Sequence, residues 1–259
     1  MVALLGACGG GVPTVTPTVK SACPDASLKG SIVVLSASSM VNVFTDVQRG
    51  FLETHPCVTE VTYSYGSSAA LATQIVNGSP ADVFVSASEA TMKVVEDAGA
   101  ASSPQVFARN YAAIMVSNSS KFVETIRGLN DLADKVNPGI TVGVCVASAP
   151  CGSTADAVLG KGGLSRNAIV DTETQSAEDL VTKLKLGELD AGIVFHSDCQ
   201  QTTRDDQLVC VAIPMEANTT TKYLVAALNN RTVARQFVDY INGSDFKAAL
   251  QDKFGFLAP

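Results

Sequence analysis

The sequence predicts an α/β protein of two lobes, each a mostly parallel sheet flanked by helices, with a ligand cleft between them. Three observations support this fold class. Strand-like and helix-like segments alternate along the chain, 46% of its 259 residues are hydrophobic, and no internal repeat divides it. A chain of this length can bury a large core and form two lobes.

The elements of the N-terminal third follow one another as strand and helix. Short apolar or alternating runs predict strands over residues 31–35, 58–65 and 82–86. Apolar residues at helical spacing predict a helix after each strand, over residues 39–51, 69–76 and 89–98. Three such units indicate a parallel sheet, which binds ligands beyond the carboxyl ends of its strands.

The rest of the chain repeats this alternation with different loops. Further strands are predicted over residues 112–116, 141–146, 191–195, 208–213 and 222–228. Helices are predicted over residues 129–135, from about 155, after a capping signal at 176–179, over 233–241 and over 245–254.

Two serine pairs stand at predicted helix N-termini. Ser38-Ser39 follows the first strand and Ser67-Ser68 follows the second, and each pair precedes a helical run. A helix N-terminus offers hydroxyl and backbone N–H donors and favours a negative guest. Two such ends at one sheet edge predict an anion site that uses no Lys or Arg. The alternative is that each serine only caps its own helix.

The net negative charge argues against two classes of binding partner. The net charge is −7 and the sequence pI is about 4.8, which argues against binding to nucleic acid or to anionic surfaces. An anionic ligand would have to be captured by local dipoles. The sequence has no apolar stretch approaching the roughly 20 residues of an ordinary membrane-spanning helix.

The N-terminal segment resembles a bacterial lipoprotein signal. Small residues precede Cys8, and a Gly-rich and then Thr/Pro-rich stretch follows it. We expect Cys8 to carry a lipid anchor on the outer side of a cell membrane, and residues 1–27 to be a signal remnant and a flexible tether. The alternative is an unprocessed tail with a chance cysteine.

Six further cysteines fit an oxidising compartment. Proximity in sequence suggests three disulfides, pairing Cys23 with Cys57, Cys145 with Cys151, and Cys199 with Cys210, which is one of fifteen arrangements. Metal ligation is the competing interpretation. The chain has no C-x-x-C, and its two histidines are His55 and His196, so a zinc site is not expected.

Several segments together resemble the molybdate-binding periplasmic proteins of ABC transporters. The segments stand in that family's order, from about residue 30 to the C-terminus, and are separately weak but jointly specific. They are Val33–Met40, Tyr65–Ala72, Gly78–Ala87, Ala177–Leu180, Gly192–Phe195 with Ser197-Asp198, and Phe254–Phe256.

The resemblance implies a fold and a function. The fold is the class II type of periplasmic binding protein. The strands that cross between the lobes are expected to divide the chain into lobe I over residues 28–111 plus 218–259 and lobe II over residues 112–217, with the hinge near Tyr111-Ala112 and Ala217-Asn218. The function is capture of molybdate or tungstate outside the cytoplasm and delivery to an ABC permease, with no enzymatic activity and no cofactor besides the bound oxyanion. A monomer tethered to the membrane through Cys8 is expected.

The resemblance also places the ligand contacts. Ser39 and Ser68 would each give a hydroxyl and a backbone N–H, and Cys151 and Leu180 would give backbone N–H groups. Phe195 stands where the family has a tyrosine, and it lacks the hydroxyl that would reach the anion. His196 is the nearest substitute donor, although neighbouring residues of a strand point to opposite faces and a structural histidine is the alternative.

Other functions stay open at this point. The same fold binds sulfate, thiosulfate, phosphate, iron and organic solutes, and it serves as the effector-sensing part of some transcription regulators. No DNA-binding segment is evident. A Ser-dependent hydrolase lacks support, because there is no G-x-S-x-G motif. Asp82, Asp179 and Asp198 are expected to orient loops or cap helices rather than touch the ligand.

Overall fold

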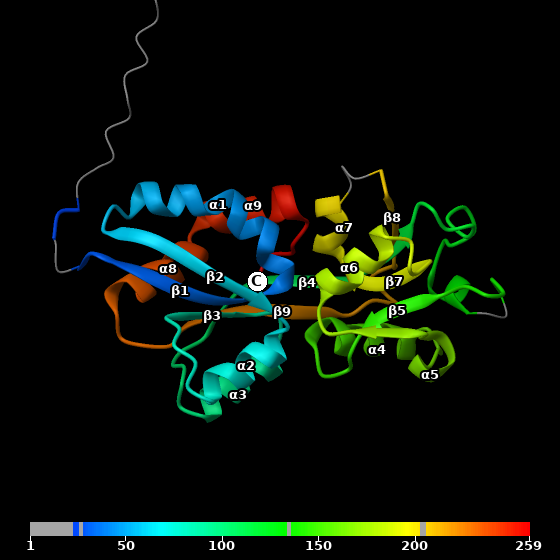
Figure 1. Ribbon diagram of the computed structural model, residues 1–259, viewed down its shortest axis with the longest axis horizontal. Helices are drawn as coiled ribbons and strands as arrows, with labels where there is room; N and C mark the ends of the chain where they lie inside the picture. Colours follow the sequence, from blue (N-terminus) through cyan, green and yellow to red (C-terminus); the bar gives the residue numbers. More distant parts are fainter. Residues whose placement is uncertain (1–22, 26–27, 134–135, 203–205) are drawn as a thin grey trace, which may run out of the picture.

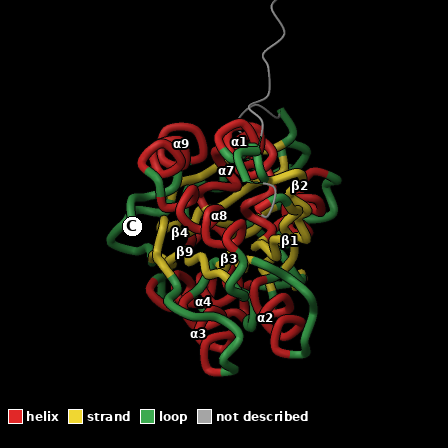
Figure 2. The backbone as a smooth tube through the Cα atoms, turned by 90° about the vertical axis from the view of Figure 1, so that its left-hand side faces the viewer, coloured by secondary structure: helices red, strands yellow, loops and turns green. Residues whose placement is uncertain are grey.

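The computed structural model describes residues 23–25, 28–133, 136–202 and 206–259. Two lobes lie side by side, and the strands run between layers of helices (Figures 1 and 2). The expected lipid anchor Cys8 and nearly all of the expected tether lie outside the described residues. None of the helices in the described part of the chain combines the length and apolar character that a bilayer-spanning segment requires.

The first lobe is built on three parallel strands and one antiparallel neighbour. β1 (Gly30–Ala37) pairs in parallel with both β2 (Val58–Gly66) and β3 (Val83–Ser86), and β3 pairs antiparallel with β9 (Thr220–Ala227). β1 and β3 are almost wholly buried, because helices cover both of their faces. The sheet therefore holds the carboxyl ends of β1 and β2 side by side.

Helices cover the two faces of this sheet separately. α1 (Val41–Thr54), α8 (Thr232–Asn242) and α9 (Ser244–Phe254) share one apolar core that includes Phe44, Phe51 and Phe237. α2 (Ser68–Val76) and α3 (Glu89–Asp97) share another on the opposite face (Figure 2). The strand–helix alternation predicted for this lobe is confirmed, with shifts of one or two residues at most ends.

The second lobe repeats the architecture. β5 (Val142–Cys145) pairs in parallel with β6 (Thr172–Thr174) and β7 (Ala191–Phe195), while β8 (Leu208–Ala212) pairs antiparallel with β4 (Gln105–Ser117). α4 (Pro150–Lys161) packs on one face of this sheet and α6 (Ala177–Lys185) on the other. α7 (His196–Thr202) follows directly on the end of β7. A short α5 (Arg166–Ile169) precedes β6.

The chain passes between the lobes within β4 and again just before β9 (Thr220–Ala227). Residues 105–111 of β4 pair with β9, whereas residues 112–117 pair with β7 and β8. β9 returns the chain to the first lobe between β3 and β4. The predicted strand at 112–116 is therefore only the second-lobe half of β4. Sequence periodicity did not indicate the first half, where buried and exposed residues are mixed.

Two other local predictions are wrong, and one helix was missed. α4 begins at Pro150 rather than near residue 155, because proline suits the first turn of a helix. The helix predicted over residues 129–135 is a 3₁₀ turn, η3 (Leu129–Leu132). α7 was not predicted, because the polar sequence from His196 to Thr202 shows no apolar periodicity.

All three predicted disulfides are present. Cys23 is bonded to Cys57, Cys145 to Cys151, and Cys199 to Cys210. The first ties the start of the described chain to the beginning of β2. The second joins the end of β5 to the first turn of α4, and the third joins α7 to β8.

Candidate functional site

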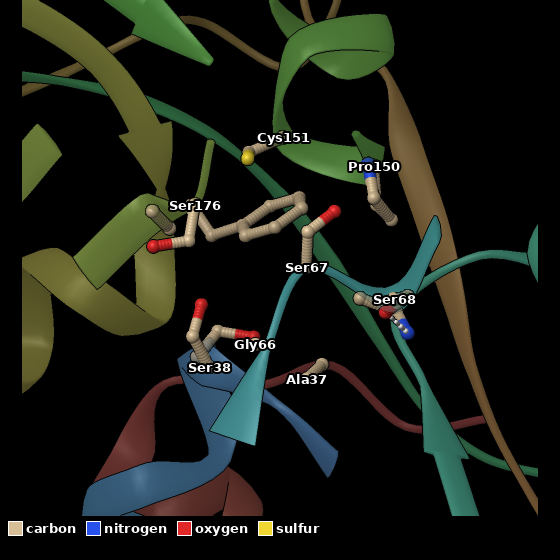
Figure 3. A pocket seen from close by; sticks show the side chains of 12 residues that line it. Ala37, Ser38, Gly66, Ser67, Ser68, Pro150, Cys151 and Ser176 are labelled. Atoms are coloured by element: carbon tan, nitrogen blue, oxygen red, sulfur yellow. Dashed lines mark hydrogen bonds between the residues drawn. The ribbon is translucent and has the colours of Figure 1, made fainter. Parts of the chain in front are cut away.

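A small cavity lies between the lobes, beyond the carboxyl ends of β1 and β2 (Figure 3). None of the residues that line it is charged. The lining residues are Ala37, Ser38, Ser39, Gly66, Ser67, Ser68, Ala87, Pro150, Cys151, Ser176, Ala177 and Phe195.

Helix N-termini converge on this cavity from both lobes. α2 begins at Ser68, α4 at Pro150 and α6 at Ala177, and all three positions line the cavity. The first N–H groups of a helix have no partner within the helix, and its dipole is positive at that end. The three helices therefore present donors and partial positive charge to one small space, which suits an anion.

Both predicted serines lie in the cavity wall, and neither hydroxyl caps its own helix. Ser39 lies in the 3₁₀ turn η2 (Ser38–Met40), and its hydroxyl is 2.7 Å from the hydroxyl of Tyr223 on β9. The Ser68 hydroxyl accepts a hydrogen bond of 3.0 Å from the backbone N–H of Ala87. The interpretation that these serines serve only as caps is not supported.

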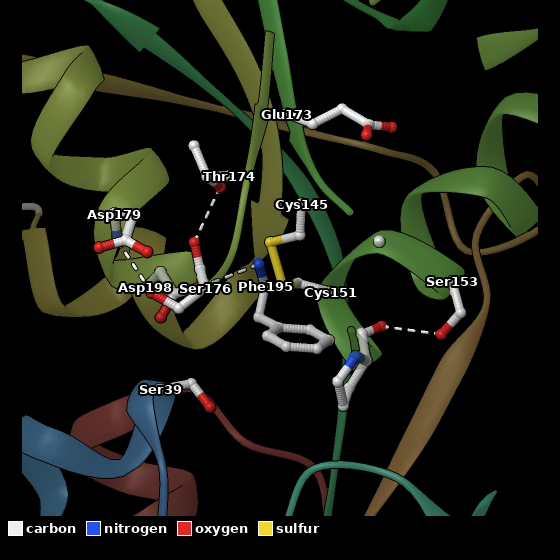
Figure 4. Close-up of a disulfide and its surroundings, with 12 residues drawn as sticks. Ser39, Cys145, Cys151, Ser153, Glu173, Thr174, Ser176, Asp179, Phe195 and Asp198 are labelled. Atoms are coloured by element: carbon white, nitrogen blue, oxygen red, sulfur yellow. Dashed lines mark hydrogen bonds between the residues drawn. A yellow bond between two sulfur atoms is a disulfide. The ribbon is translucent and has the colours of Figure 1, made fainter. Parts of the chain in front are cut away.

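The loop between β5 and α4 brings Cys151 to the cavity. The disulfide to Cys145 holds the first turn of α4 against the end of β5 (Figure 4). A Cβ on Gly152 would lie 2.0 Å from the carbonyl oxygen of Val146, so glycine is needed for this close approach. Arg166 supports the same loop from behind, with its guanidinium 3.1 Å from the Cys145 carbonyl oxygen. Cys151 therefore lies in the cavity wall, at the second residue of α4.

Leu180 is not at the cavity. Its side chain is fully buried in the second lobe, and its N–H bonds the carbonyl of Ser176 within α6. Ser176 and Ala177, at the start of the same helix, line the cavity in its place. The capping signal that predicted α6 could have identified them, since the first N–H groups of a helix are the free ones.

Phe195 lines the cavity, and His196 does not. β7 ends at Phe195 and α7 begins at His196, so the alternation of a strand no longer decides where the histidine points. The His196 ring stacks on Tyr111 with a centroid separation of 4.4 Å, and Nδ1 is 3.1 Å from the Gly255 carbonyl oxygen. Burial lowers the pKa of His196, against a smaller opposing effect of that hydrogen bond. His196 therefore makes the contacts of a structural histidine, which was the alternative to a ligand donor.

Of the three aspartates expected to orient loops or cap helices, two accept backbone N–H groups with their carboxylates. The Asp82 carboxylate accepts from the N–H of Val33, at 2.8 Å. Asp198 accepts from the N–H of Phe195, at 3.1 Å, and burial raises its pKa to about 7 (Figure 4). Asp179 donates its own N–H to the Ser176 hydroxyl. None of the three lines the serine cavity, although Asp198 lines a neighbouring one with Ser38 and Ser39.

Metal ligation has no candidate in the parts of the chain that the structure describes. No group of three or more His, Cys, Asp or Glu side chains there is placed to hold a metal ion. The hydroxyl and N–H donors of the cavity suit oxyanion oxygens rather than a bare cation.

The fold and the cavity are those of an extracytoplasmic solute-binding protein. Residues 32–257 match the family described as bacterial extracellular solute-binding protein, and the chain belongs to that family. Membership in a family of binding proteins confirms the expectation that the chain is not an enzyme.

Individual relatives have narrower names. The chain is 33% identical to the molybdate-binding protein ModA of Mycobacterium tuberculosis, over 100% of this chain and 95% of the relative. It is 28% identical to ModA of Escherichia coli, over 88% and 89%. A substrate-binding lipoprotein of Bacillus subtilis, YvgL, is 23% identical over 90% and 89%.

Solved structures share the fold. A periplasmic molybdate-binding protein from Azotobacter vinelandii superimposes with a TM-score of 0.73, at 20% identity, over 88% of this chain and 99% of that one. The sulfate-binding protein SubI from Mycobacterium tuberculosis also gives 0.73, at 17% identity, over 88% and 92%. The predicted two-lobed periplasmic-binding-protein fold is therefore confirmed.

Proposed function

We propose that this chain captures molybdate or tungstate outside the cytoplasm and delivers it to an ABC permease. One observation carries the proposal: three helix N-termini and five serines surround a cavity whose lining has no charged side chain. Such a wall suits a fully deprotonated oxyanion, because it offers hydroxyl and N–H donors and has no carboxylate to accept a ligand proton. The full-length similarity to ModA supports molybdate in particular.

The lobes and the tether complete the proposal. Lobe I comprises residues 28–111 plus 218–259 and lobe II residues 112–217, because β4 changes its pairing partner from β9 to β7 and β8 at Tyr111–Ala112. The hinge lies there and at Ala217–Asn218. The anion closes the lobes by contacting both. Cys8 carries the lipid anchor of a monomer, in keeping with the similarity to a lipoprotein.

Sulfate is the second candidate ligand. The sulfate-binding SubI structure matches as well as the molybdate-binding one, so the fold does not choose between the two anions. Calorimetric titration with molybdate, tungstate, sulfate and phosphate in parallel makes the choice. We expect molybdate and tungstate to bind at least about tenfold more tightly than the others, a difference of about 1.4 kcal/mol. Equal or tighter sulfate binding would contradict the molybdate assignment.

The Ser68→Ala variant tests the site itself. It removes one hydroxyl donor to a charged ligand, so molybdate affinity should fall by about 1.5–3 kcal/mol, or roughly 10- to 150-fold. Ser120→Ala is the matched control, because the Ser120 hydroxyl bonds Asp190 in the second lobe away from the cavity. The control should lose stability but keep its affinity. Unchanged binding by Ser68→Ala would reject the proposed site.

A further inference from the structure

A chain of buried polar side chains lies behind Ser39. Asn110 on β4, Ser197 at the start of α7 and Tyr223 on β9 are all fully buried. The Asn110 amide nitrogen is 2.8 Å from the Ser197 hydroxyl and 3.4 Å from the Tyr223 hydroxyl. The Tyr223 hydroxyl is in turn 2.7 Å from that of Ser39. These bonds connect Ser197 in the second lobe to the cavity wall of the first through one residue of β4 and one of β9.

The backbone fixes which way the Asn110 amide faces. Its side-chain oxygen lies 2.9 Å from the N–H of Tyr111 and 3.4 Å from the N–H of Ser197. Both of these groups can only donate, so the carbonyl oxygen must face them. The NH₂ group of Asn110 must then face the two hydroxyls, and Asn110 donates to Tyr223.

The Tyr223 hydroxyl has one available acceptor for its proton among the described residues. Among the described residues, the Ser39 hydroxyl oxygen is the acceptor within hydrogen-bonding distance of Tyr223, since the Asn110 nitrogen is a donor. A buried hydroxyl proton without an acceptor would be costly, so Tyr223 donates to Ser39. Burial raises the pKa of Tyr223, which keeps that proton in place.

Because the Ser39 hydroxyl accepts from Tyr223, its own proton can be donated into the cavity. Ser68 has the same polarity by a different route, because its hydroxyl oxygen accepts from the backbone N–H of Ala87. In both serines a donor from the protein occupies one side of the oxygen. Ser39 differs in that its donor is a side chain, and a side chain can be changed by mutation.

We infer that Tyr223 is a positioning residue that orients the Ser39 hydroxyl as a donor and thereby favours an oxyanion without protons over one that carries a proton. This inference rests on the proposed oxyanion-binding function. On this inference the site needs no substitute donor at His196 for the hydroxyl that Phe195 lacks. The Tyr223 hydroxyl lies behind the cavity wall and acts through Ser39.

A double-mutant cycle tests whether Tyr223 acts through Ser39. The variants are Tyr223→Phe, Ser39→Ala and the two combined, with molybdate affinity measured by calorimetry. We expect Tyr223→Phe to weaken binding about five- to tenfold in the wild-type background, as the loss of one hydrogen-bond interaction would. In the Ser39→Ala background the same change should alter affinity less than about twofold, because no hydroxyl remains to be oriented.

Tyr63→Phe is the matched control. The Tyr63 hydroxyl is buried and, within the described structure, has no hydrogen-bond partner. Tyr63 lies on β2 away from the cavity lining, so its loss should leave affinity and selectivity unchanged. If Tyr223→Phe binds molybdate as tightly as Tyr63→Phe does, or if its effect persists undiminished without Ser39, the inference is overturned.

Selectivity is the readout that a merely structural role would not move. At mildly alkaline pH, phosphate is mainly HPO₄²⁻, a dianion with one proton, while molybdate is a dianion with none. In Tyr223→Phe the Ser39 oxygen is free to accept a ligand proton, so the ratio of phosphate to molybdate dissociation constants should fall at least threefold. An unchanged ratio would contradict the assigned polarity.

Asn110→Asp reverses the polarity without removing Tyr223, and it covers the case in which Tyr223→Phe does not fold. A carboxylate would accept the Tyr223 proton, and Ser39 would then have to donate to Tyr223. We expect a greater loss of molybdate affinity than of HPO₄²⁻ affinity, and the added charge cannot cause that difference because both ligands are dianions. Wild-type selectivity in this variant overturns the inference. Absence of any oxyanion binding by the wild-type protein would instead reject the proposed function, and the inference with it.

Discussion

Asp198 combines a buried carboxylate with a position next to the site. It lies in the first turn of α7, accepts a hydrogen bond from the N–H of Phe195, and is 9% exposed. Burial raises its pKa to about 7, although the bond from Phe195 opposes the shift. The carboxyl group of the folded protein therefore changes its charge close to neutral pH, within one residue of Ser197 and the polar chain behind Ser39.

The first prediction concerns the pH dependence of stability. Between about pH 4 and 7 the folded protein holds a proton on Asp198 that the unfolded chain has released. Folding stability due to this group is therefore full below pH 4 and falls as pH rises to 7, by a few kcal/mol at most. Asp198→Asn keeps the acceptor for Phe195 and removes the titration, so its unfolding free energy should depend less on pH.

Denaturant unfolding at several pH values between 4 and 8 checks this prediction. Asp252→Asn removes a carboxylate from the exposed part of α9 and serves as the control, with a pH dependence like that of the wild type. At pH 8 the Asp198→Asn variant should be at least as stable as the wild type. Parallel pH profiles for wild type and Asp198→Asn would contradict the raised pKa.

Single residues mark the limit of what sequence could predict at the site. Ser39 and Ser68 were recognised because the serine pairs recur before helices and match a family pattern. Tyr223 was not, because it follows Ser39 by 184 residues and reaches it only after β9 has paired beside β3. Partners so distant depend on tertiary packing, and local patterns carry no signal for them.

At the level of elements, the site is an arrangement of helix starts. α2, α4 and α6 each begin at the cavity, and the strands before them fix where those beginnings lie. Sequence predicted the three helices but placed the start of α4 about five residues late. Cys151 and Gly152 were interpreted as loop residues, whereas Pro150 at the first helical position was the signal that this loop is already helix.

Two glycines of α4 provide a matched test of this arrangement. In Gly152→Ala the new Cβ would meet the backbone oxygens of Val146 and Cys145 at 2.0 and 2.6 Å, so the first turn must move. We expect a loss of about 1–3 kcal/mol of stability and weaker molybdate binding, because the N–H of Cys151 moves with it. Gly160→Ala, with no atom within 4 Å of its Cβ, should instead stabilise the helix by about 0.5–1 kcal/mol.

Thermal unfolding and calorimetric titration of the two variants measure these effects. Both substitutions add one methyl group to the same helix, so differences in helix propensity largely cancel. If Gly152→Ala bound molybdate with wild-type affinity, the close approach at the start of α4 would have no part in forming the site.

For the whole molecule, the two passages of the chain between the lobes, within β4 and just before β9, decide how the lobes are joined. The alternation of strands and helices was enough to predict two α/β lobes, because each unit buries an apolar face of its own. It could not predict that β4 extends through both lobes, since the pairing of residues 105–111 depends on β9, which is formed more than 100 residues later. Sequence therefore indicated where the chain passes between the lobes, at 111–112 and 217–218, but not how the strands pair there.

Asn218 holds the crossing region together. It is 2% exposed, and its side-chain oxygen accepts from the N–H groups of Ala112 and Thr219 at 3.0 and 2.8 Å. Its NH₂ group donates to the carbonyl oxygens of Ala112 and Ile213 at 2.8 and 3.1 Å. All four hydrogen-bonding positions of the amide are thus used, between the two segments that we propose as the hinge.

Asn218→Asp should weaken both folding and binding at neutral pH. One carboxylate oxygen can still accept from Ala112 and Thr219, but the other would face two carbonyl oxygens with no proton between them, at a cost of about 2–4 kcal/mol. The proposed hinge would position the lobes for closure, so molybdate affinity should fall although the cavity lining is intact. The apparent affinity should fall in proportion to the fraction of molecules that can still close. Lowering the pH should reduce both deficits, since a protonated carboxyl can again donate to a carbonyl. Asn230→Asp adds the same charge at an exposed position and should show neither effect. If Asn218→Asp unfolded and bound molybdate as the wild type does, this amide would be excluded as the link between the lobes.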